Sequence, residues 1–274
     1  MLEVYYYEDS ICAEKVLMTL AEKGVDNWVR HHVHLFKHEQ FDPDYITINP
    51  KAQVPTVIHD GKIIRESSII CDYIDDLYPE PPLKPVDRAE IAQMREWVKE
   101  VDEFAFEAVA SLSFTAVFRD RLLNMSDQDR AAYWAGQTLL DRTIRQQSCV
   151  YDGINSPYAI RALVAWERIF DKIEHTLEDG RDWLMGDLFS LAEINFAPLI
   201  ARTGSMGILS LWFDNRPNTI AWWERITARP SFAEGNVGAP AEEQKLYAGA
   251  GASIIDAARK RLDAYKADYS SALS

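Results

Sequence analysis

The sequence predicts a small α/β domain followed by a larger all-α domain. Over the first 80 residues, short β-rich runs alternate with helical periodicity. Four prolines then fall between residues 79 and 85, and a helix cannot continue through them. From residue 87 onward the periodicity is helical, with no convincing strand. We therefore expect domains at residues 1–80 and 87–274, joined by a linker at residues 81–86.

The expected elements of the first domain follow from local signals. Asp60-Gly61 between two apolar runs is a strong signal for a two-residue hairpin, and Gly24 is a typical helix stop. In order, we expect a strand over 2–7, a helix over 13–24, a strand over 28–35, a hairpin around 60–61 and a helix over 67–77. This βαβ–ββα order is the thioredoxin-like pattern.

The second domain is expected to be a bundle of helices. Its clearest start signal is Ser190-Leu191-Ala192-Glu193, a capping box in which Ser190 and Glu193 satisfy each other's backbone N–H groups. The other expected helices cover residues 87–118, 126–148, 158–177, 217–228 and 254–269.

Composition excludes several function classes. The formal charge of −14 would repel nucleic acid and anionic membranes. No apolar run approaches the roughly 20 residues of a membrane helix, and the N-terminus lacks a basic leader region. Three cysteines are an odd number in a long chain, which favours a reducing compartment over a disulfide framework. We therefore expect a cytoplasmic chain that binds neither nucleic acid nor membrane.

Residues 49–70 carry the most specific pattern. Pro55 cannot donate a ladder hydrogen bond, so it belongs at the start of a strand, and the X-Pro bond is a candidate cis bond. The Val54 backbone is then free to pair with an extended peptide. Ser67 opens a helix whose N-terminus suits a carboxylate, and Glu66 can pair with an ammonium. The pattern predicts a receptor for a small peptide that carries an amine and a carboxylate at one end.

This pattern, Asn-Pro-x-x-x-Val-Pro-x-Val followed by Glu-Ser-x-x-Ile, resembles the glutathione site of the soluble glutathione transferases. Residues 183–194 are similar to the Gly-Asp-x-x-Ser-x-Ala-Asp segment of that family's helical domain, with Glu193 in place of the usual Asp. The resemblance omits only residues 120–160 and the last 40. It implies a thioredoxin-like domain followed by a helical bundle, glutathione as co-substrate, an active cleft between the domains, and a homodimer or a heterodimer.

Glutathione chemistry needs the thiol as thiolate. Lowering a thiol pKa of about 8.5 by two units takes about 2.7 kcal/mol, which a hydroxyl hydrogen bond and a helix N-terminus can supply. Ser10 stands between the first strand and the first helix, and it matches the catalytic Ser of theta-like and zeta-like transferases. The alternatives are that Ser10 is only a helix cap, or that Tyr6, Cys12 or a backbone amide serves the thiolate.

The resemblance also implies the other contacts of glutathione. Gln40 matches a residue that contacts the glycyl carboxylate. Gln53 and the Val54 backbone, next to Pro55, hold the cysteinyl part, and Glu66 with Ser67 holds the γ-glutamyl end. For Gln53 a plain surface-loop role is the alternative.

The histidines of residues 31–34 do not predict a metal site. Strand alternation puts His32 and His34 on one face and His31 on the other, and no Cys or Asp at ligand spacing completes a set. We therefore expect no metal.

A second substrate would bind against the helical domain. Phe106, Phe114 and Phe118 could receive an aromatic electrophile, although an aromatic stripe at helical spacing is also typical of a core. Residues 88–103 resemble the corresponding segment of bacterial β-aryl etherases of the LigF type, which displace an aryloxide from a lignin-derived dimer and leave a glutathione thioether. The alternatives are a general glutathione transferase, a dehalogenase, a glutathionyl lyase, or a poorly active binding subunit.

Overall fold

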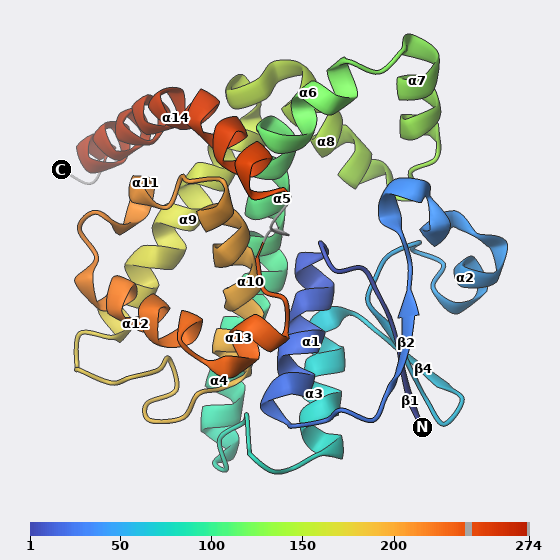
Figure 1. Cartoon of the computed structure of the whole chain (residues 1–274). Helices are drawn as coiled ribbons and strands as arrows, with labels where there is room; N and C mark the ends of the chain where they lie inside the picture. Colours follow the sequence, from blue (N-terminus) through green and yellow to red (C-terminus); the bar gives the residue numbers. More distant parts are fainter. Residues whose placement is uncertain (239–242, 273–274) are drawn as a thin grey trace. The chain divides into compact units, whose positions relative to one another are not determined.

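The computed structural model of the chain describes residues 1–238 and 243–272 (Figure 1). The described residues group into two compact units, each built from several segments of the chain. Unit 1 contains residues 1–99, 177–201 and 221–238, and unit 2 contains residues 100–176, 202–220 and 243–272. These units do not test the domain boundary expected at residues 81–86, which stays a prediction.

Unit 1 is built around a four-stranded mixed sheet. The strands are β1 (Leu2–Tyr6), β2 (Val29–His32), β3 (Thr56–His59) and β4 (Lys62–Arg65). Their order is β2-β1-β3-β4, with β2 parallel to β1 and the other neighbours antiparallel. Helix α1 (Ile11–Glu22) connects β1 to β2, and α3 (Ser67–Leu77) follows β4, so the predicted βαβ–ββα order is confirmed.

The hairpin forms as predicted, whereas the second strand is shorter than expected. Asp60 and Gly61 have φ of 48° and 76°, the left-handed conformation that a two-residue turn of type I′ requires. Strand β2 ends at His32, and short 3-10 turns η1 (Leu35–Lys37) and η2 (Glu39–Phe41) lead into α2 (Pro43–Ile48). The alternation predicted over residues 28–35 therefore stops before its end, because η1 begins at Leu35.

The helices of unit 1 supply its core. Val16 and Leu20 of α1 and Ile70 and Ile74 of α3 are fully or almost fully buried, and the two helices pack side by side (Figure 1). Burial of one such side chain contributes about 1.5–3 kcal/mol to the free energy of unfolding. The packing of α1 against α3 is therefore a main source of stability for unit 1. Helices α4 (Arg88–Glu100), α12 (Pro217–Thr227) and α13 (Pro230–Glu234) contribute further residues to unit 1.

The predicted capping box opens α10 (Leu191–Ser205). The hydroxyl of Ser190 accepts a hydrogen bond from the Ala192 N–H at 3.1 Å, and the Glu193 carboxylate accepts from the Ser190 N–H at 3.0 Å. Glu193 also accepts from the Ser190 hydroxyl at 2.7 Å. The cap therefore survives the replacement of the family's Asp by Glu.

All regular elements among the described residues of unit 2 are helices. A π-helical segment, η3 (Val101–Ala105), follows α4, and η4 (Gly153–Asn155) is a short 3-10 turn. The helices are α5 (Phe106–Thr115), α6 (Val117–Leu123), α7 (Asp127–Ala135), α8 (Leu140–Asp152), α9 (Pro157–Thr176), α11 (Ser210–Phe213) and α14 (Gln244–Ala272). The single helix predicted over residues 126–148 is two helices, because the chain leaves α7 at Gly136. No helix within the described ranges is both long and apolar enough to cross a membrane.

Helix α14 begins ten residues earlier than predicted and crosses the chain closely at Gly251. A Cβ placed on Gly251 would lie 1.7 Å from the carbonyl oxygen of Met206. A Cβ on Gly249, two positions away from the contact, would meet nothing within 4 Å. Only the hydrogen of glycine fits between the two backbones at residue 251.

We expect Gly251→Ala to lower the free energy of unfolding by about 1–3 kcal/mol, because the α14 backbone must move away from Met206. The matched variant Gly249→Ala is expected to raise it by about 0.4–1 kcal/mol through the lower entropy of its unfolded chain. Urea denaturation of both variants measures the difference. Equal stability of the two variants would contradict the close crossing.

Candidate active site

The strand pairing brings the candidate glutathione residues to one end of the sheet. We call this end the edge of the site; it is formed by the C-terminal ends of β1, β2 and β4 and the N-terminal end of β3. Tyr5 near the end of β1 pairs with Thr56 at the start of β3, and Thr56 pairs with Arg65 at the end of β4. Strand β2 is parallel to β1, so its end lies at the same edge. Ser10 therefore follows β1, Gln40 follows β2, Val54 precedes β3, and Glu66 follows β4. All four follow or precede strand ends at this same end of the sheet.

The loop before β3 is fixed by one buried amide. Asn49 is 3% exposed; its Nδ2 donates to the carbonyl oxygen of Gln53 at 2.8 Å and to Thr56 Oγ1 at 3.0 Å. Its Oδ1 accepts from the N–H of Lys51 at 3.1 Å. The Tyr45 hydroxyl donates to the same Gln53 carbonyl at 2.5 Å. Burial raises the pKa of Tyr45 to about 12, so this hydroxyl stays protonated over the physiological range.

The loop presents the Val54 backbone. The Val54–Pro55 bond is cis, as the sequence suggested, and β3 begins only at Thr56. Within the described part of the chain, neither the N–H nor the C=O of Val54 has a hydrogen-bond partner. The Val54 side chain is buried against Tyr7 and Tyr45. The residue is thus anchored by its side chain while its backbone is available.

The turn into α3 places an acid and two serines together. Glu66 has φ of 67°, and Ser67 and Ser68 after it are nine-tenths buried at the start of α3. The half-exposed carboxylate of Glu66 pairs with the Lys51 ammonium at 2.6 Å. This ion pair joins the turn before α3 to the loop before β3. Sequence reasoning missed Lys51, whose only signal was its place inside the Asn-Pro motif.

Ser10 is the N-cap of α1. Its hydroxyl accepts from the Ala13 N–H at a long 3.4 Å, and its own N–H donates to the Tyr7 carbonyl at 3.0 Å. The side chain is half-buried. Tyr6 packs edge-on against Trp28 at 5.9 Å. A weak capping bond leaves the hydroxyl able to donate to a thiolate, and the thiolate role of Ser10 stays a prediction.

Gln40 lies in η2 and is half-buried. Its Oε1 is buried and has no hydrogen-bond partner among the residues that the structure describes. A buried amide oxygen without a partner is uncommon in proteins. Its role toward the glycyl carboxylate stays a prediction.

The histidines of β2 have carboxylate partners that the sequence did not indicate. His31 Nε2 lies 2.8 Å from Glu3 Oε2, and its ring stacks on Tyr5 at 4.2 Å. His32 bonds to Glu8, on the opposite face. The described residues hold no group of three or more His, Cys, Asp or Glu side chains that could bind a metal ion.

The candidate electrophile residues have different surroundings. Phe114 is 9% exposed and packs with Leu122 and Cys149 in the core of unit 2, and Phe118 contacts it at a ring distance of 5.1 Å. Phe106 is half-buried at the start of α5. The interior position of Phe114 agrees with the core alternative, and a substrate role for any of the three stays a prediction.

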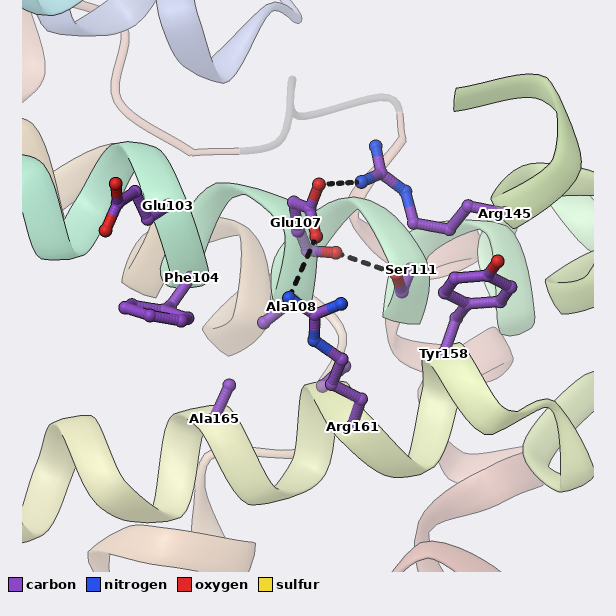
Figure 2. Close-up of a pocket in the computed structure, with 10 residues that line it drawn as sticks. Glu103, Phe104, Glu107, Ala108, Ser111, Arg145, Tyr158, Arg161 and Ala165 are labelled. Carbon is purple, nitrogen blue, oxygen red and sulfur yellow. Dashed lines mark hydrogen bonds and ion pairs between the residues drawn. The ribbon is translucent and has the colours of Figure 1, made fainter. Parts of the chain in front are cut away.

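Unit 2 also contains a shallow, open hollow lined by residues of α5, α8 and α9, which the sequence did not predict. Figure 2 shows the guanidinium groups of Arg145 and Arg161 approaching Glu107 from two sides. Arg145 Nη1 lies 2.7 Å from the Glu107 carboxylate and Arg161 Nη2 lies 3.6 Å from it. Arg145 is 8% exposed, so Glu107 compensates a buried charge.

We expect Glu107→Ala to lower the free energy of unfolding by about 1–3 kcal/mol, because it leaves the buried Arg145 without a counter-charge. Arg161→Met, which removes the exposed partner of the same carboxylate, should change it by less than about 0.5 kcal/mol. Thermal denaturation at low and high salt measures the loss of stability in each of the two variants. A loss of stability that is equal in both variants would mean that Arg145 does not depend on Glu107.

Comparison with known proteins finds relatives of this chain. The glutathione S-transferase N-terminal domain matches residues 4–82, and the C-terminal domain matches residues 149–230. Protein LigF of Sphingobium sp. is 30% identical over 257 residues, covering 85% of this chain and 92% of that protein. A tetrachloro-p-hydroquinone reductive dehalogenase of Sphingobium chlorophenolicum is 26% identical over 245 residues, covering 86% and 96%.

The fold matches solved structures as well. The crystal structure of the β-etherase LigF from Sphingobium sp. superposes with a TM-score of 0.75 at 28% identity and covers 85% of this chain and 98% of that one. The two family domains, the 30% identity and the thioredoxin-like sheet agree with each other. The chain therefore belongs to the glutathione S-transferase family, whose co-substrate is glutathione.

Proposed function

We propose that the chain is an active transferase in which the thiolate of glutathione attacks an electrophilic carbon and Ser10 stabilises that thiolate. The observation that carries the proposal is the common sheet edge to which the pairing brings Ser10, Val54 and Glu66. Hydroxyl, backbone and carboxylate groups there match the thiol, the cysteinyl backbone and the amine of one tripeptide. Family membership supports the same reading.

The residues of this edge would divide the tripeptide among them. The Val54 N–H and C=O pair with the cysteinyl backbone, and Gln53 lies beside them. Glu66 receives the γ-glutamyl ammonium, and the start of α3 at Ser67 receives the carboxylate. Gln40 reaches the glycyl end. The sulfur then lies near Ser10, whose hydroxyl donates to it while the N-terminus of α1 favours its negative charge.

The proposed electrophile is a β-aryl ether of a lignin-derived dimer. In that reaction a carbon–sulfur bond forms as the carbon–oxygen bond breaks, and the aryloxide leaves and takes a proton from solvent. The products are a glutathione thioether and a phenol. The support is the similarity to LigF, both in sequence and in fold.

Mass spectrometry of the products tests this substrate. The purified chain is incubated with glutathione and a racemic β-aryl ether dimer. We expect a glutathione thioether and released phenol in equal amounts, and the enantiomer that remains gives the stereochemistry. Absence of both products, from a chain that binds glutathione, would exclude this substrate and leave the transferase proposal intact.

A second candidate substrate is a chlorinated hydroquinone. In that reaction a carbon–sulfur bond to the same thiolate forms as a carbon–chlorine bond breaks and chloride leaves, and the similarity to the reductive dehalogenase of Sphingobium chlorophenolicum favours it. The test compares two rates in the presence of glutathione: chloride release from tetrachlorohydroquinone and phenol release from the ether dimer. Faster chloride release would place this candidate first.

We propose further that the chain is a homodimer, as is common in the family. Light scattering of the purified chain during gel filtration is expected to give twice the mass of 31.3 kDa. A monomer that gains activity only with a second protein would favour a heterodimer.

A further inference from the structure

Lys51 is held in a defined place within the loop before β3. Its N–H donates to Asn49 Oδ1 at 3.1 Å, and Asn49 is buried and bonds twice more within the same loop. The ammonium of Lys51 reaches the Glu66 carboxylate at 2.6 Å. The two side chains are 52% and 55% exposed, so solvent and ligands can reach both groups.

We propose that Lys51 and Glu66 together form a receptor for the zwitterionic γ-glutamyl end of glutathione, in which Lys51 binds the α-carboxylate. The inference rests on the proposed glutathione site and adds a specificity-determining residue to it. In the free protein the two side chains neutralise each other. In the complex, Glu66 turns to the ligand's ammonium and Lys51 to its carboxylate.

The chemistry of the ligand is the reason that a cation is needed there. The ammonium and the carboxylate of a γ-glutamyl group sit on the same carbon atom. A carboxylate that binds the ammonium therefore lies within a few ångströms of the ligand's carboxylate and repels it. An ammonium beside Glu66 removes this repulsion, and the four-carbon stem of lysine lets that ammonium move from one carboxylate to the other. The N-terminus of α3 attracts the same carboxylate, so the two effects add.

The binding of three ligands to the full-length chain tests the inference. They are glutathione, the analogue without the α-carboxylate (4-aminobutanoyl-cysteinyl-glycine), and the analogue without the α-amine (glutaryl-cysteinyl-glycine). Calorimetry gives each Kd. For Lys51→Met we expect glutathione to bind about fivefold more weakly, the size of an ion pair that is partly exposed. The Kd of the analogue without the carboxylate should change by less than twofold.

Two further variants separate a specific contact from general charge. Lys62→Met removes an exposed lysine from β4 and should leave the Kd of glutathione within twofold. Lys51→Arg keeps the cation and should bind glutathione almost as wild type does. In 1 M salt the fivefold effect of Lys51→Met should shrink, because the groups are exposed.

Two results would overturn the inference. If Lys51→Met weakens glutathione and the analogue without the carboxylate by the same factor, Lys51 supports the loop and does not bind the carboxylate. If Lys51→Met changes neither Kd, the ion pair has no part in recognition. Failure of the wild-type chain to bind glutathione at all would instead overturn the proposed function, and with it this inference.

Discussion

Ser10→Ala is expected to lower turnover by up to about 50-fold near pH 6.5 while the Kd of glutathione changes by less than about threefold. If Ser10 lowers the thiol pKa by two units, its loss returns that pKa to about 8.5 and the thiolate fraction at pH 6.5 falls by that factor. The defect should shrink as the pH rises above 8.5, where the thiol ionises without help. The ultraviolet absorbance of the thiolate, titrated with glutathione bound, measures the pKa without any electrophile.

The N-cap role of Ser10 needs its own control. Ala lacks a capping group and costs about 0.5–2 kcal/mol of stability, whereas Gly costs only a few tenths. Ser10→Gly should therefore lose activity as Ser10→Ala does but keep its stability. Ser10→Thr keeps both the hydroxyl and the cap. If Ser10→Gly titrates its bound thiol like wild type, the thiolate role passes to Tyr6, Cys12 or a backbone amide.

Glu193→Ala is expected to lower the free energy of unfolding by about 3–5 kcal/mol, the largest stability effect we foresee. The Glu193 carboxylate is fully buried and accepts from the N–H of Leu184 at 2.6 Å, from the N–H and hydroxyl of Ser190, and from Trp222 Nε1 at 3.4 Å. Burial raises the pKa of Glu193, and the hydrogen bonds from Leu184 and Ser190 oppose that rise. Alanine leaves these donors buried without an acceptor, and each unsatisfied donor costs about 1–3 kcal/mol.

Urea denaturation measures this loss, with two variants for comparison. Glu234→Ala removes an exposed glutamate from α13 and should change stability by less than about 0.5 kcal/mol. Glu193→Asp restores the family's usual residue but is one methylene shorter, so it should keep the Ser190 cap and lose the bond to Leu184. A stability of Glu193→Asp at or above wild type would mean that the segment before α10 adapts to the shorter acid.

The parts of the fold that the sequence predicted are those fixed by neighbouring residues. The Asp60-Gly61 turn, the Ser190–Glu193 cap and the strand start after Pro55 each depend on the conformational preference of a few adjacent residues. Such preferences act whatever the rest of the chain does. The part of the candidate glutathione site from Gln53 to Ser67 could be predicted for the same reason, because its motif is continuous over residues 49–70.

Features that depend on distant contacts could not be predicted. The early start of α14 accompanies the packing of Tyr247, which is 1% exposed. Its ring lies edge-on to the ring of Phe118 in α6, with 6.5 Å between the ring centroids. The pairing of Lys51 with Glu66 needs the hairpin to fold back over 15 residues. The hollow around Glu107 needs three helices to meet. Sequence periodicity shows which face of a helix is buried and does not show what lies against it.

The bonds of Asn49 have a consequence for the kinetics of binding. One buried side chain ties residues 49, 51, 53 and 56 together, so this loop should open as a single cooperative unit. The hydrogen-bonded backbone amides of Lys51 and Ala52 should then share one slow rate of exchange with deuterated water. Because the loop is ordered before any ligand arrives, association should carry no cost of loop ordering, and the rate of glutathione capture should be set by diffusion and charge.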